Sequence, residues 1–369
     1  MMLGMTEGAR LLEESLSLSL LHGFHDHASR AYTNFSECCM LLRDFAKAEK
    51  LIVEGTALCV QFDLDGAAHY LLGRHAQLRM EQGRLHEAET IAEGVVTMDG
   101  FPRVMHLPAL SVLARVKLRL GQREKALELL QRALAEGLYT GEPQRIIPVR
   151  LALLEAAWLS DDSDAAKTHV AELLLLGSET MNMWDLGEVL VWQHRFSLAA
   201  SPISTAEIAA PRAAELAGDI ERAADLWLAL DQPYEAALCL LQARAEDVRQ
   251  ALPRAVKLLD DLEAQGTASF ARRLGMRLGL EDVMPKKRRG PYSSSRQHPL
   301  GLTQSEQIVL GSLVEGLSNK EIARALSRSL RTVEHQVSSL LAKFNAANRL
   351  EVLLRVRSEP WLVDRNAEG

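Results

Sequence analysis

Apolar side chains recur at helical spacing from about residue 6 to about residue 280, so the pattern predicts helices almost throughout this stretch. Alanine and leucine are abundant and aromatic residues make up only 5% of the chain, which also favours helices. A second helical stretch is predicted over residues 302–357, where helix-start signals alternate with apolar stripes. We therefore expect an all-α protein.

The first stretch contains a short pattern that recurs along the chain. In each copy a Gly or Asp ends one helix and caps the next, and a small residue follows inside the second helix. These small residues are Ala48, Ala88, Ala126, Ala166 and Ala224. The first three steps are 40, 38 and 40 residues and the last is 58, so we expect an irregular segment between about 180 and 212. A nearly fixed period of this size is typical of stacked helical hairpins, in which alanine lets two helices approach closely.

This part of the chain resembles tetratricopeptide-type repeats. Its period is longer than the ~34 residues usual for that family, and the full consensus is not kept. A generic helical bundle therefore remains the alternative. In either case each helix pair buries its apolar stripe against its neighbours.

Residues 284–301 interrupt the helical pattern with prolines, glycines and serines, which cannot sustain a helix. We therefore expect a helical-repeat sensor or interaction domain at 1–283, a linker at 284–301 and a terminal domain at 302–369. Residues 284–369 carry a net charge of +6 and residues 1–283 one of −13, which suits the tail to a polyanion. The basic run at 286–289 is either an arm that touches phosphate or a merely solvated segment.

The terminal domain is predicted to contain four short helices. Their start signals are the capping boxes at 303–306 and 318–321, Ser329, and the N-cap pattern at 348–351. Gly316 ends the first helix and the second ends near Leu326. Asn345 ends the third because asparagine tolerates the left-handed conformation. The fourth helix runs through Val356.

The third helix of this domain has two different faces. Its buried stripe is expected to be Val333, Val337, Leu340, Leu341 and Phe344. The side chains at 331, 334, 335, 338 and 342 fall on the opposite face. A short helix, a tight turn and a longer helix with a polar outer face form a helix-turn-helix. The longer helix can enter a DNA major groove, about 12 Å wide, while the start of the shorter helix, with Lys320, can hold a phosphate.

Residues 302–352 resemble the LuxR-type (NarL- or GerE-like) DNA-binding domain of bacterial transcription regulators. The matching positions are Leu302, Thr303, Glu306, Val309, Leu310, the run 316–323, Leu326, Ser329, Thr332, Val333, Val337, Lys343 and Arg349. The departures are Ser305, Glu334, Gln336, Phe344 and Asn345. Glu334, where the family often has Lys, leaves the DNA sequence open, because a carboxylate cannot hold phosphate but can accept from cytosine N4.

The resemblance implies roles for individual residues. The bases would be read by Glu334, His335 and Ser338. The DNA backbone would be held by Lys320, Arg331, Thr332 and Lys343. Other interpretations stay open, namely a pair of Glu334 with Arg331, a merely solvated His335, and Lys343 as a cation at a helix C-terminus. The fourth helix would pair two domains on a two-fold DNA site through Leu350, Leu353 and Leu354.

Helical repeats before a LuxR-type domain resemble the large MalT-like regulators of that family, in which a nucleotide-binding ATPase module precedes the helical sensor. The chain contains no GxxxxGK[ST] phosphate loop, so the ATPase is either lost or lies outside this chain. The paired acidic pattern of a receiver domain is also lacking. The start of the chain has no basic region before its apolar residues, so a signal peptide is not expected.

Other chemistry finds little support in the sequence. No catalytic constellation, cofactor motif or membrane-spanning run stands out. The four cysteines lack metal-ligand spacing and are interpreted as buried thiols. The histidines at 22, 25 and 27 are interpreted as a helix-end turn rather than a metal site. Trp184, Trp192 and Trp227 either belong to the core or line a ligand pocket, and the core interpretation is favoured.

We therefore expect a cytoplasmic, nucleoid-associated transcription regulator and not an enzyme. Its body would receive a signal from an unknown ligand or protein, and its terminal domain would bind double-stranded DNA as a homodimer. No cofactor, metal or membrane is expected to take part. The alternative is a repeat scaffold for protein–protein interaction whose DNA-binding tail is weak or vestigial. A sigma-factor-like terminal domain would share the helix-turn-helix but not the fourth helix.

Overall fold

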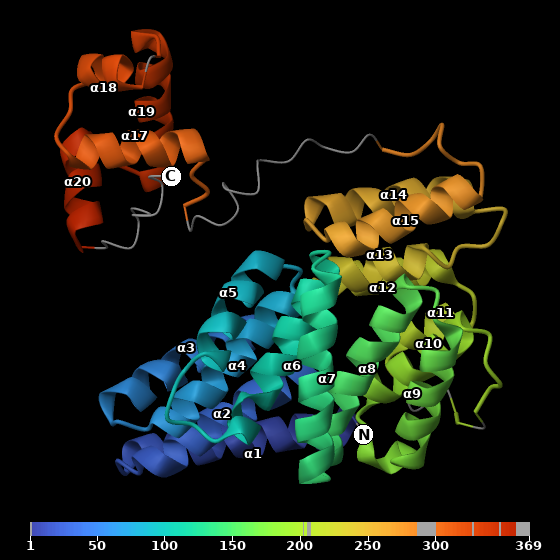
Figure 1. Cartoon of the computed structure of the whole chain (residues 1–369). Coiled ribbons are helices and arrows are strands. Elements are labelled where there is room, and N and C mark those ends of the chain that lie inside the picture. Colours follow the sequence, from blue (N-terminus) through green and yellow to red (C-terminus); the bar gives the residue numbers. More distant parts are fainter. Residues whose placement is uncertain are drawn as a thin grey trace. The chain divides into compact units, whose positions relative to one another are not determined.

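The computed structural model describes residues 2–201, 203–204, 208–285, 300–326, 328–346 and 348–358. The chain divides into two compact units, Met1–Lys286 and Lys287–Gly369. The described residues are helices joined by turns and loops, without a strand (Figure 1). None of these helices is long and apolar enough to cross a membrane. Most of the predicted linker, including the basic run at 286–289, lies outside the described residues.

The first unit begins with a regular series of helices. They are α1 (Met2–Leu21), α2 (His25–Leu41), α3 (Phe45–Gln61), α4 (Asp65–Glu81), α5 (Leu85–Val96), α6 (Arg103–Arg119), α7 (Arg123–Thr140), α8 (Pro143–Leu159) and α9 (Ser163–Leu175). Each helix packs against the next one along the chain, and alternate helices such as α4, α6 and α8 also contact one another. This is the arrangement of stacked helical hairpins, so the all-α repeat fold predicted from the sequence is confirmed (Figure 1).

The turns between these helices follow a common geometry. A residue with positive φ recurs every 20 residues, first at Gly23, Arg43, Asp63 and Gly83, and then at Gly121, Gly141 and Asp161. The next helix begins two residues later, and Asp44 and Asp162 cap it by accepting from a backbone N–H. Two helices of about 17 residues and two such turns give the period of 40.

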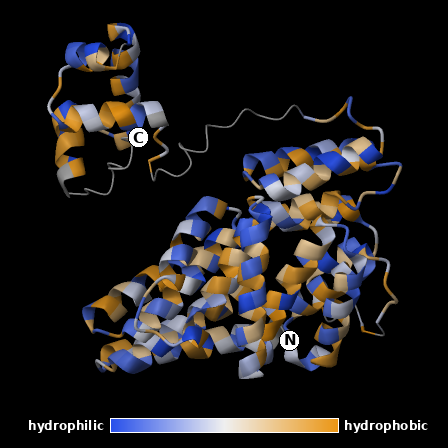
Figure 2. Ribbon diagram, in the orientation of Figure 1, coloured by the Kyte–Doolittle hydropathy of each residue, from blue (hydrophilic) through white to orange (hydrophobic). Residues whose placement is uncertain are grey.

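The small residues that define the repeat are buried. Ala48, Ala88, Ala126, Ala166 and Ala224 are all 0% exposed. Each lies in the first turns of the second helix of its hairpin, where a larger side chain would hold the two helices apart. Figure 2 shows apolar residues on the facing sides of the helices and polar residues outside. The amphipathic pattern therefore predicted both the elements and the faces that they bury.

The predicted irregular segment follows α9. A short 3-10 helix, η1 (Ser178–Thr180), precedes α10 (Met183–Arg195), and the described residues between Arg195 and Ala210 form neither helix nor strand. The unit then continues with α11 (Ala210–Leu216), α12 (Ile220–Ala229), α13 (Pro233–Leu240), α14 (Val248–Asp261) and α15 (Gln265–Arg277).

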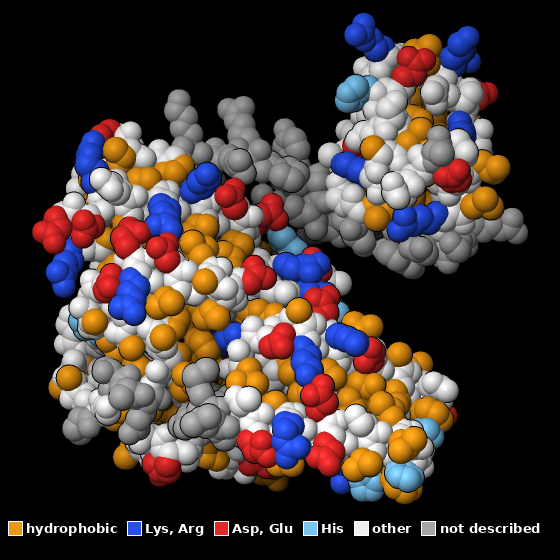
Figure 3. Space-filling view, turned by 180° about the vertical axis from the view of Figure 1, so that it is seen from behind, with side chains coloured by type: hydrophobic (Ala, Val, Ile, Leu, Met, Phe, Trp, Pro, Cys, Tyr) orange, Lys and Arg blue, Asp and Glu red, His pale blue; other side chains and the backbone are white. Residues whose placement is uncertain are grey.

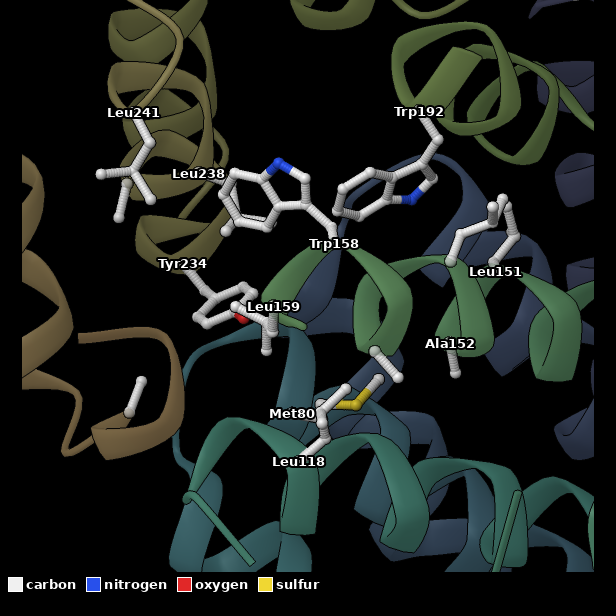
Figure 4. Close-up of a cluster of buried hydrophobic side chains, with 14 of the residues drawn as sticks. Met80, Leu118, Leu151, Ala152, Trp158, Leu159, Trp192, Tyr234, Leu238 and Leu241 are labelled. Carbon is white, nitrogen blue, oxygen red and sulfur yellow. The ribbon is translucent and has the colours of Figure 1, made fainter. Parts of the chain in front are cut away.

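The late helices pack back onto the early ones, because α15 contacts α6 and α8. Figure 4 shows the resulting core, in which Met80, Leu118, Trp158, Trp192 and Tyr234 come from five different helices. The rings of Trp158 and Trp192 lie 5.6 Å apart. Residues far apart in the sequence therefore share one hydrophobic core.

The second unit contains α17 (Gln304–Val314), α18 (Asn319–Ala325), α19 (Leu330–Phe344) and α20 (Arg349–Ser358). These four helices surround a core of their own, which includes Leu310, Ile322, Val333, Leu340 and Val352. The four-helix arrangement predicted for the terminal domain is confirmed.

The histidines near the start of the chain and the four cysteines belong to the body. His22 lies in the turn between α1 and α2, and the ring of His25 stacks on Phe62 at 3.5 Å. In the part of the chain that the structure describes, no group of His, Cys, Asp and Glu is placed to hold a metal. The four cysteines are free thiols, of which Cys38 is half-buried and the others are buried.

Candidate nucleic-acid interface

Helices α18 and α19 form a short helix, a tight turn and a longer helix. The capping box of α18 is complete, since Ser318 Oγ accepts from the backbone N–H of Glu321 and the Glu321 carboxylate accepts from that of Ser318. Ser329 caps α19 by accepting from the backbone N–H of Thr332 at 3.1 Å. Asn345 ends α19 with φ of 48°, in the left-handed conformation that the sequence predicted.

The two faces of α19 differ as its sequence predicts. Val333, Leu340 and Phe344 are buried, and Val337 and Leu341 are half-buried against the same core. Arg331, Thr332, Glu334, His335, Ser338 and Ala342 are exposed. In Figure 3, Lys and Arg side chains project from this unit at the end where α18 and the start of α19 lie in Figure 1. The unit thus presents one helix with a polar outer face.

The three residues expected to read bases lie together on this face. Glu334, His335 and Ser338 occupy successive positions around one side of α19. The Ser338 hydroxyl donates to the carbonyl of Glu334 at 3.0 Å, within the helix. No ion pair of the described residues joins Arg331 to Glu334, which was the alternative for the carboxylate. The structure therefore leaves these side chains facing solvent.

The residues expected to hold the DNA backbone fall into two groups. Lys320 on α18 and Arg331 on α19 are exposed cations. The hydroxyl of Thr332 is hydrogen-bonded to Ser329 Oγ at 2.7 Å, at the start of α19. Lys343 differs from them, because it has protein partners.

Lys343 belongs to a network that joins α19 to the start of α17. Its Nζ lies 2.7 Å from the carboxylate of Glu306 and donates to the carbonyl of Gly301 at 2.8 Å. The same carboxylate accepts from Ser339 at 2.6 Å. Burial alone would raise the pKa of Glu306, but the hydrogen bonds from Lys343, Ser339 and Thr303 lower it to about 2. This geometry favours a structural role for Lys343, and its expected phosphate contact stays a prediction.

Two arginines have structural roles that sequence reasoning did not assign. Arg328 donates to Gln336 at 3.2 Å and lies 3.5 Å from the hydroxyl of Ser305, so it joins two of the positions that depart from the LuxR pattern. Arg349 donates to the carbonyl of Leu313 in the last turn of α17 and to that of Leu317, which lies between α17 and α18. The match at Arg349 is thus explained by the fold of the domain.

Helix α20 presents an apolar outer side. Leu350 is 63% exposed and Leu354 is 57% exposed, while Leu353 is half-buried. Val352 and Val356 face the core of the domain. Two exposed leucines four residues apart lie on one face of the helix. The residues expected to pair two domains thus include two exposed leucines, and the pairing stays a prediction.

Comparisons with known proteins agree with this geometry. Residues 300–356 match the model of the family described as bacterial regulatory proteins, luxR family. The DNA-binding transcriptional activator DevR/DosR of Mycobacterium tuberculosis is 27% identical over 198 residues, which cover 53% of this chain and 90% of that protein. The transcriptional regulatory protein ComA of Bacillus subtilis is 32% identical over 79 residues, which cover 21% of this chain and 37% of that protein.

A third relative is more similar in sequence over a shorter stretch. The probable transcriptional regulator ycf29 of Pyropia yezoensis is 48% identical over 52 residues, which cover 14% of this chain and 23% of that protein. The matches to ComA and ycf29 thus span less than half of those proteins. Residues 300–356 therefore form a C-terminal helix-turn-helix domain of the luxR family of bacterial regulatory proteins.

Proposed function

We propose that the terminal domain binds double-stranded DNA by placing α19 in the major groove, and that the chain regulates transcription from there. The observation that carries this proposal is the exposed polar face of Arg331, Glu334, His335 and Ser338 on a capped helix that follows the short helix α18. A major groove accepts an α-helix, and side chains at its start reach base edges. We therefore expect the chain to act at the bacterial nucleoid, where the chromosomal DNA lies.

Within this interface Glu334, His335 and Ser338 read bases. A carboxylate accepts a hydrogen bond from cytosine N4, and histidine and serine can pair with several base edges. Lys320, Arg331 and Thr332 hold the DNA backbone, which positions the domain but reads no sequence. Lys343 would reach a phosphate only by leaving Glu306, so we assign it mainly to the fold of the domain.

We further propose that two chains bind one two-fold DNA site through α20. The exposed leucines Leu350 and Leu354, with the half-buried Leu353, form the contact. The contact is small, so it would form on DNA rather than in free solution. Half-sites one helical turn apart, roughly 10 base pairs, suit such a pair.

The helical body, which we place at 1–283, is proposed to receive the signal, and residues 284–301 to link it to the DNA-binding domain at 302–369. Stacked hairpins form large surfaces and internal spaces that suit a ligand or a partner protein. The charge of −13 on this part keeps it away from the DNA backbone. The body would therefore control the terminal domain without binding DNA itself.

Selection of bound fragments from the source genome by the purified full chain tests this function. We expect a common motif with two-fold symmetry, and protection of that motif in footprinting. The matched control is the chain with Arg331→Ala and His335→Ala, which keeps the core of the domain. Recovery of the same random fragments by both proteins would contradict sequence-specific binding and favour the scaffold alternative.

A further inference from the structure

The helical body encloses a cavity that the DNA-binding function does not use. It holds about 160 Å³ of water-accessible space and lies among α4, α6, α8 and α10. Contacts between distant parts of the chain close it, because Trp184 Nε1 donates to the carbonyl of Leu41 at 2.8 Å and the Gln232 amide donates to Glu81. The stacked hairpins therefore curl around an internal space.

One part of the cavity wall is apolar. Leu107, Pro108 and Val112 come from α6, and Pro148 and Leu151 from α8. The rings of Trp184 and Trp227 lie 5.7 Å apart beside them. A cavity of about 150 Å³ admits one molecule the size of benzene. The volume thus suits a small organic molecule. Trp184 and Trp227 belong to the hydrophobic core, as the sequence favoured, and they also line this cavity.

Another part of the wall carries buried N–H groups without a protein partner. Trp227 is 1% exposed, yet its indole Nε1 makes no hydrogen bond. The Nε atoms of Arg43 and Arg212 are likewise buried and unpaired. The Nε atom of Arg74 and one acceptor, the Oε1 atom of Gln232, are also buried and unpaired on this wall. Buried polar groups in native proteins are almost always hydrogen-bonded, so four unpaired donors against one unpaired acceptor indicate a missing acceptor.

Two of these donors belong to guanidinium groups that lie over neighbouring indole rings. The Arg43 guanidinium lies 4.0 Å from the centre of the Trp184 ring, and the Arg212 guanidinium lies 4.7 Å from that of Trp227. Since the two indole rings are neighbours, both cations border the same end of the cavity. A single small group with two or three acceptor oxygens can meet them.

Arg43 also has a left-handed backbone conformation and a weak charge partner. Its φ is +60°, at a turn position that glycine fills at 23, 83 and 121 and aspartate at 63 and 161. Its ion pair with Glu81 is long, at 3.8 Å. Burial lowers the pKa of the Arg43 guanidinium, since the nearby carboxylates compensate its charge only in part.

The other charges of the cavity wall are largely engaged. Arg115 is paired with Glu155 and Glu188, and Arg212 with Glu235 at 2.8 Å. Burial, followed by the charge of Glu188, raises the pKa of Asp185 to about 7, so this carboxyl is only partly ionised at neutral pH. Arg43 therefore faces the cavity with an incompletely balanced positive charge.

We propose that this cavity binds a small organic anion, whose oxygens accept from Arg43, Arg212 and Trp227 and whose apolar body packs on α6 and α8. The proposal names the chemical class of the signal and so rests on the sensing role proposed for the body. A carboxylate or a phosphate ester supplies the required acceptors. The bound anion balances Arg43 and fills the space between helices that are far apart in the sequence.

The thermal stability of the full chain without DNA tests the ligand class. The probes are hexanoate, phenylacetate and phenyl phosphate, with hexanamide, phenylacetamide and inorganic phosphate as matched controls. We expect at least one organic anion at millimolar concentration to raise Tm by several degrees, while the amides and inorganic phosphate leave it unchanged. A larger shift with carboxylates than with phenyl phosphate, or the reverse, identifies the head group. No shift with any organic anion, or an equal shift with the amides, overturns the proposal.

Variants at the turn that contains Arg43 distinguish binding of the anion from a role of Arg43 in the stability of the fold. Arg43→Gly removes the cation and relieves the positive φ, so we expect an unchanged or higher Tm without anion and no response to it. Asp63→Gly relieves the same backbone strain outside the cavity and should keep the response. A loss of several degrees in Arg43→Gly without anion would assign Arg43 to the fold instead and overturn the proposal, as would a retained response. DNA binding measured on the same variants reports on the terminal domain independently.

Discussion

Glu306 and Lys343 lie 2.7 Å apart and join the capping box of α17 to the last turn of the proposed recognition helix. The Glu306 carboxylate is buried and also accepts from Ser339 and from the backbone of Thr303. A carboxylate with several donors is held ionised, and it fixes the angle of α19 against α17. The position of the face that we propose to read DNA thus depends on an ion pair at the other end of α19.

The depressed pKa of Glu306 predicts acid sensitivity of the terminal domain. Its pKa is about 2 in the folded domain and 4.5 is its ordinary value, so it contributes stability above pH 4.5 that is lost as the pH falls towards 2. The contribution is on the order of 3 kcal/mol. Urea unfolding at pH 7 and pH 3 should show about 2 kcal/mol of this difference, because Glu306 is still mostly ionised in the folded domain at pH 3. Glu306→Gln should remove most of it. If Glu306→Gln loses as much stability between pH 7 and pH 3 as the parent domain does, Glu306 is not the source of the acid sensitivity.

Lys343→Met is expected to lower the stability of the terminal domain rather than to change its contacts with DNA phosphates. Leaving Glu306 buried without its cation should lower the free energy of unfolding by roughly 1–3 kcal/mol. The salt dependence of DNA binding should stay unchanged. If Lys343 instead holds a phosphate, as the sequence predicts, the variant would keep its stability and lose about one unit of the slope of log K against log salt.

Glu334→Ala should change which base is preferred rather than the overall fold. Glu334 is exposed on α19, so its removal leaves the core intact. Loss of a cytosine contact should alter the preference at one base pair by roughly 1–3 kcal/mol, and affinity for random DNA should rise because a negative charge leaves the interface. Competition assays against operators that vary at each position measure this. If the affinity for all operators shifts equally and the base preference does not change, Glu334 does not read a base.

Arg331→Ala and Lys320→Ala should weaken binding to every sequence. Each exposed cation that contacts a phosphate contributes about one unit to the salt slope, so each variant should lower that slope by about one. Arg254→Ala, an exposed arginine of the body, is the matched control and should have no effect. If Arg331→Ala changes the base preference, Arg331 contacts a base rather than only a phosphate.

Leu354→Lys should prevent the pairing of two domains on DNA without unfolding the domain that carries it. The side chain is 57% exposed, so the domain should keep its Tm while cooperative binding to a two-fold site is lost. Binding to a single half-site should persist. Val352→Ala is the contrast, because Val352 is 1% exposed and its truncation should lower stability by about 1–2 kcal/mol. Unchanged cooperativity in Leu354→Lys would exclude α20 as the pairing surface.

The sequence predicted features that depend on local signals. Capping boxes, the left-handed Asn345 and the buried alanines of the repeat follow from a few neighbouring residues, and all are found. The two faces of α19 follow from helical periodicity alone. Local patterns therefore gave the helices, their ends and their buried faces.

The missed features depend on contacts between distant residues. The bond of Lys343 to Glu306 spans 37 residues, and the closure of the cavity joins Leu41 to Trp184 across 143. Neither has a periodic signature, because both arise only after the helices pack. Arg43 at its turn does not mark the cavity either, because Asp63 and Asp161 occupy equivalent turns with positive φ.

The most direct test of sequence-specific DNA recognition is the affinity of the full chain for a selected operator and for a shuffled duplex of the same composition. Both should be measured at two salt concentrations, with the chain carrying Glu334→Ala and His335→Ala as control. We predict at least 10³-fold tighter binding to the operator at moderate salt, and a much smaller ratio in the variant. Equal affinity of the parent chain for both duplexes would contradict the proposal that the exposed face of α19 reads DNA.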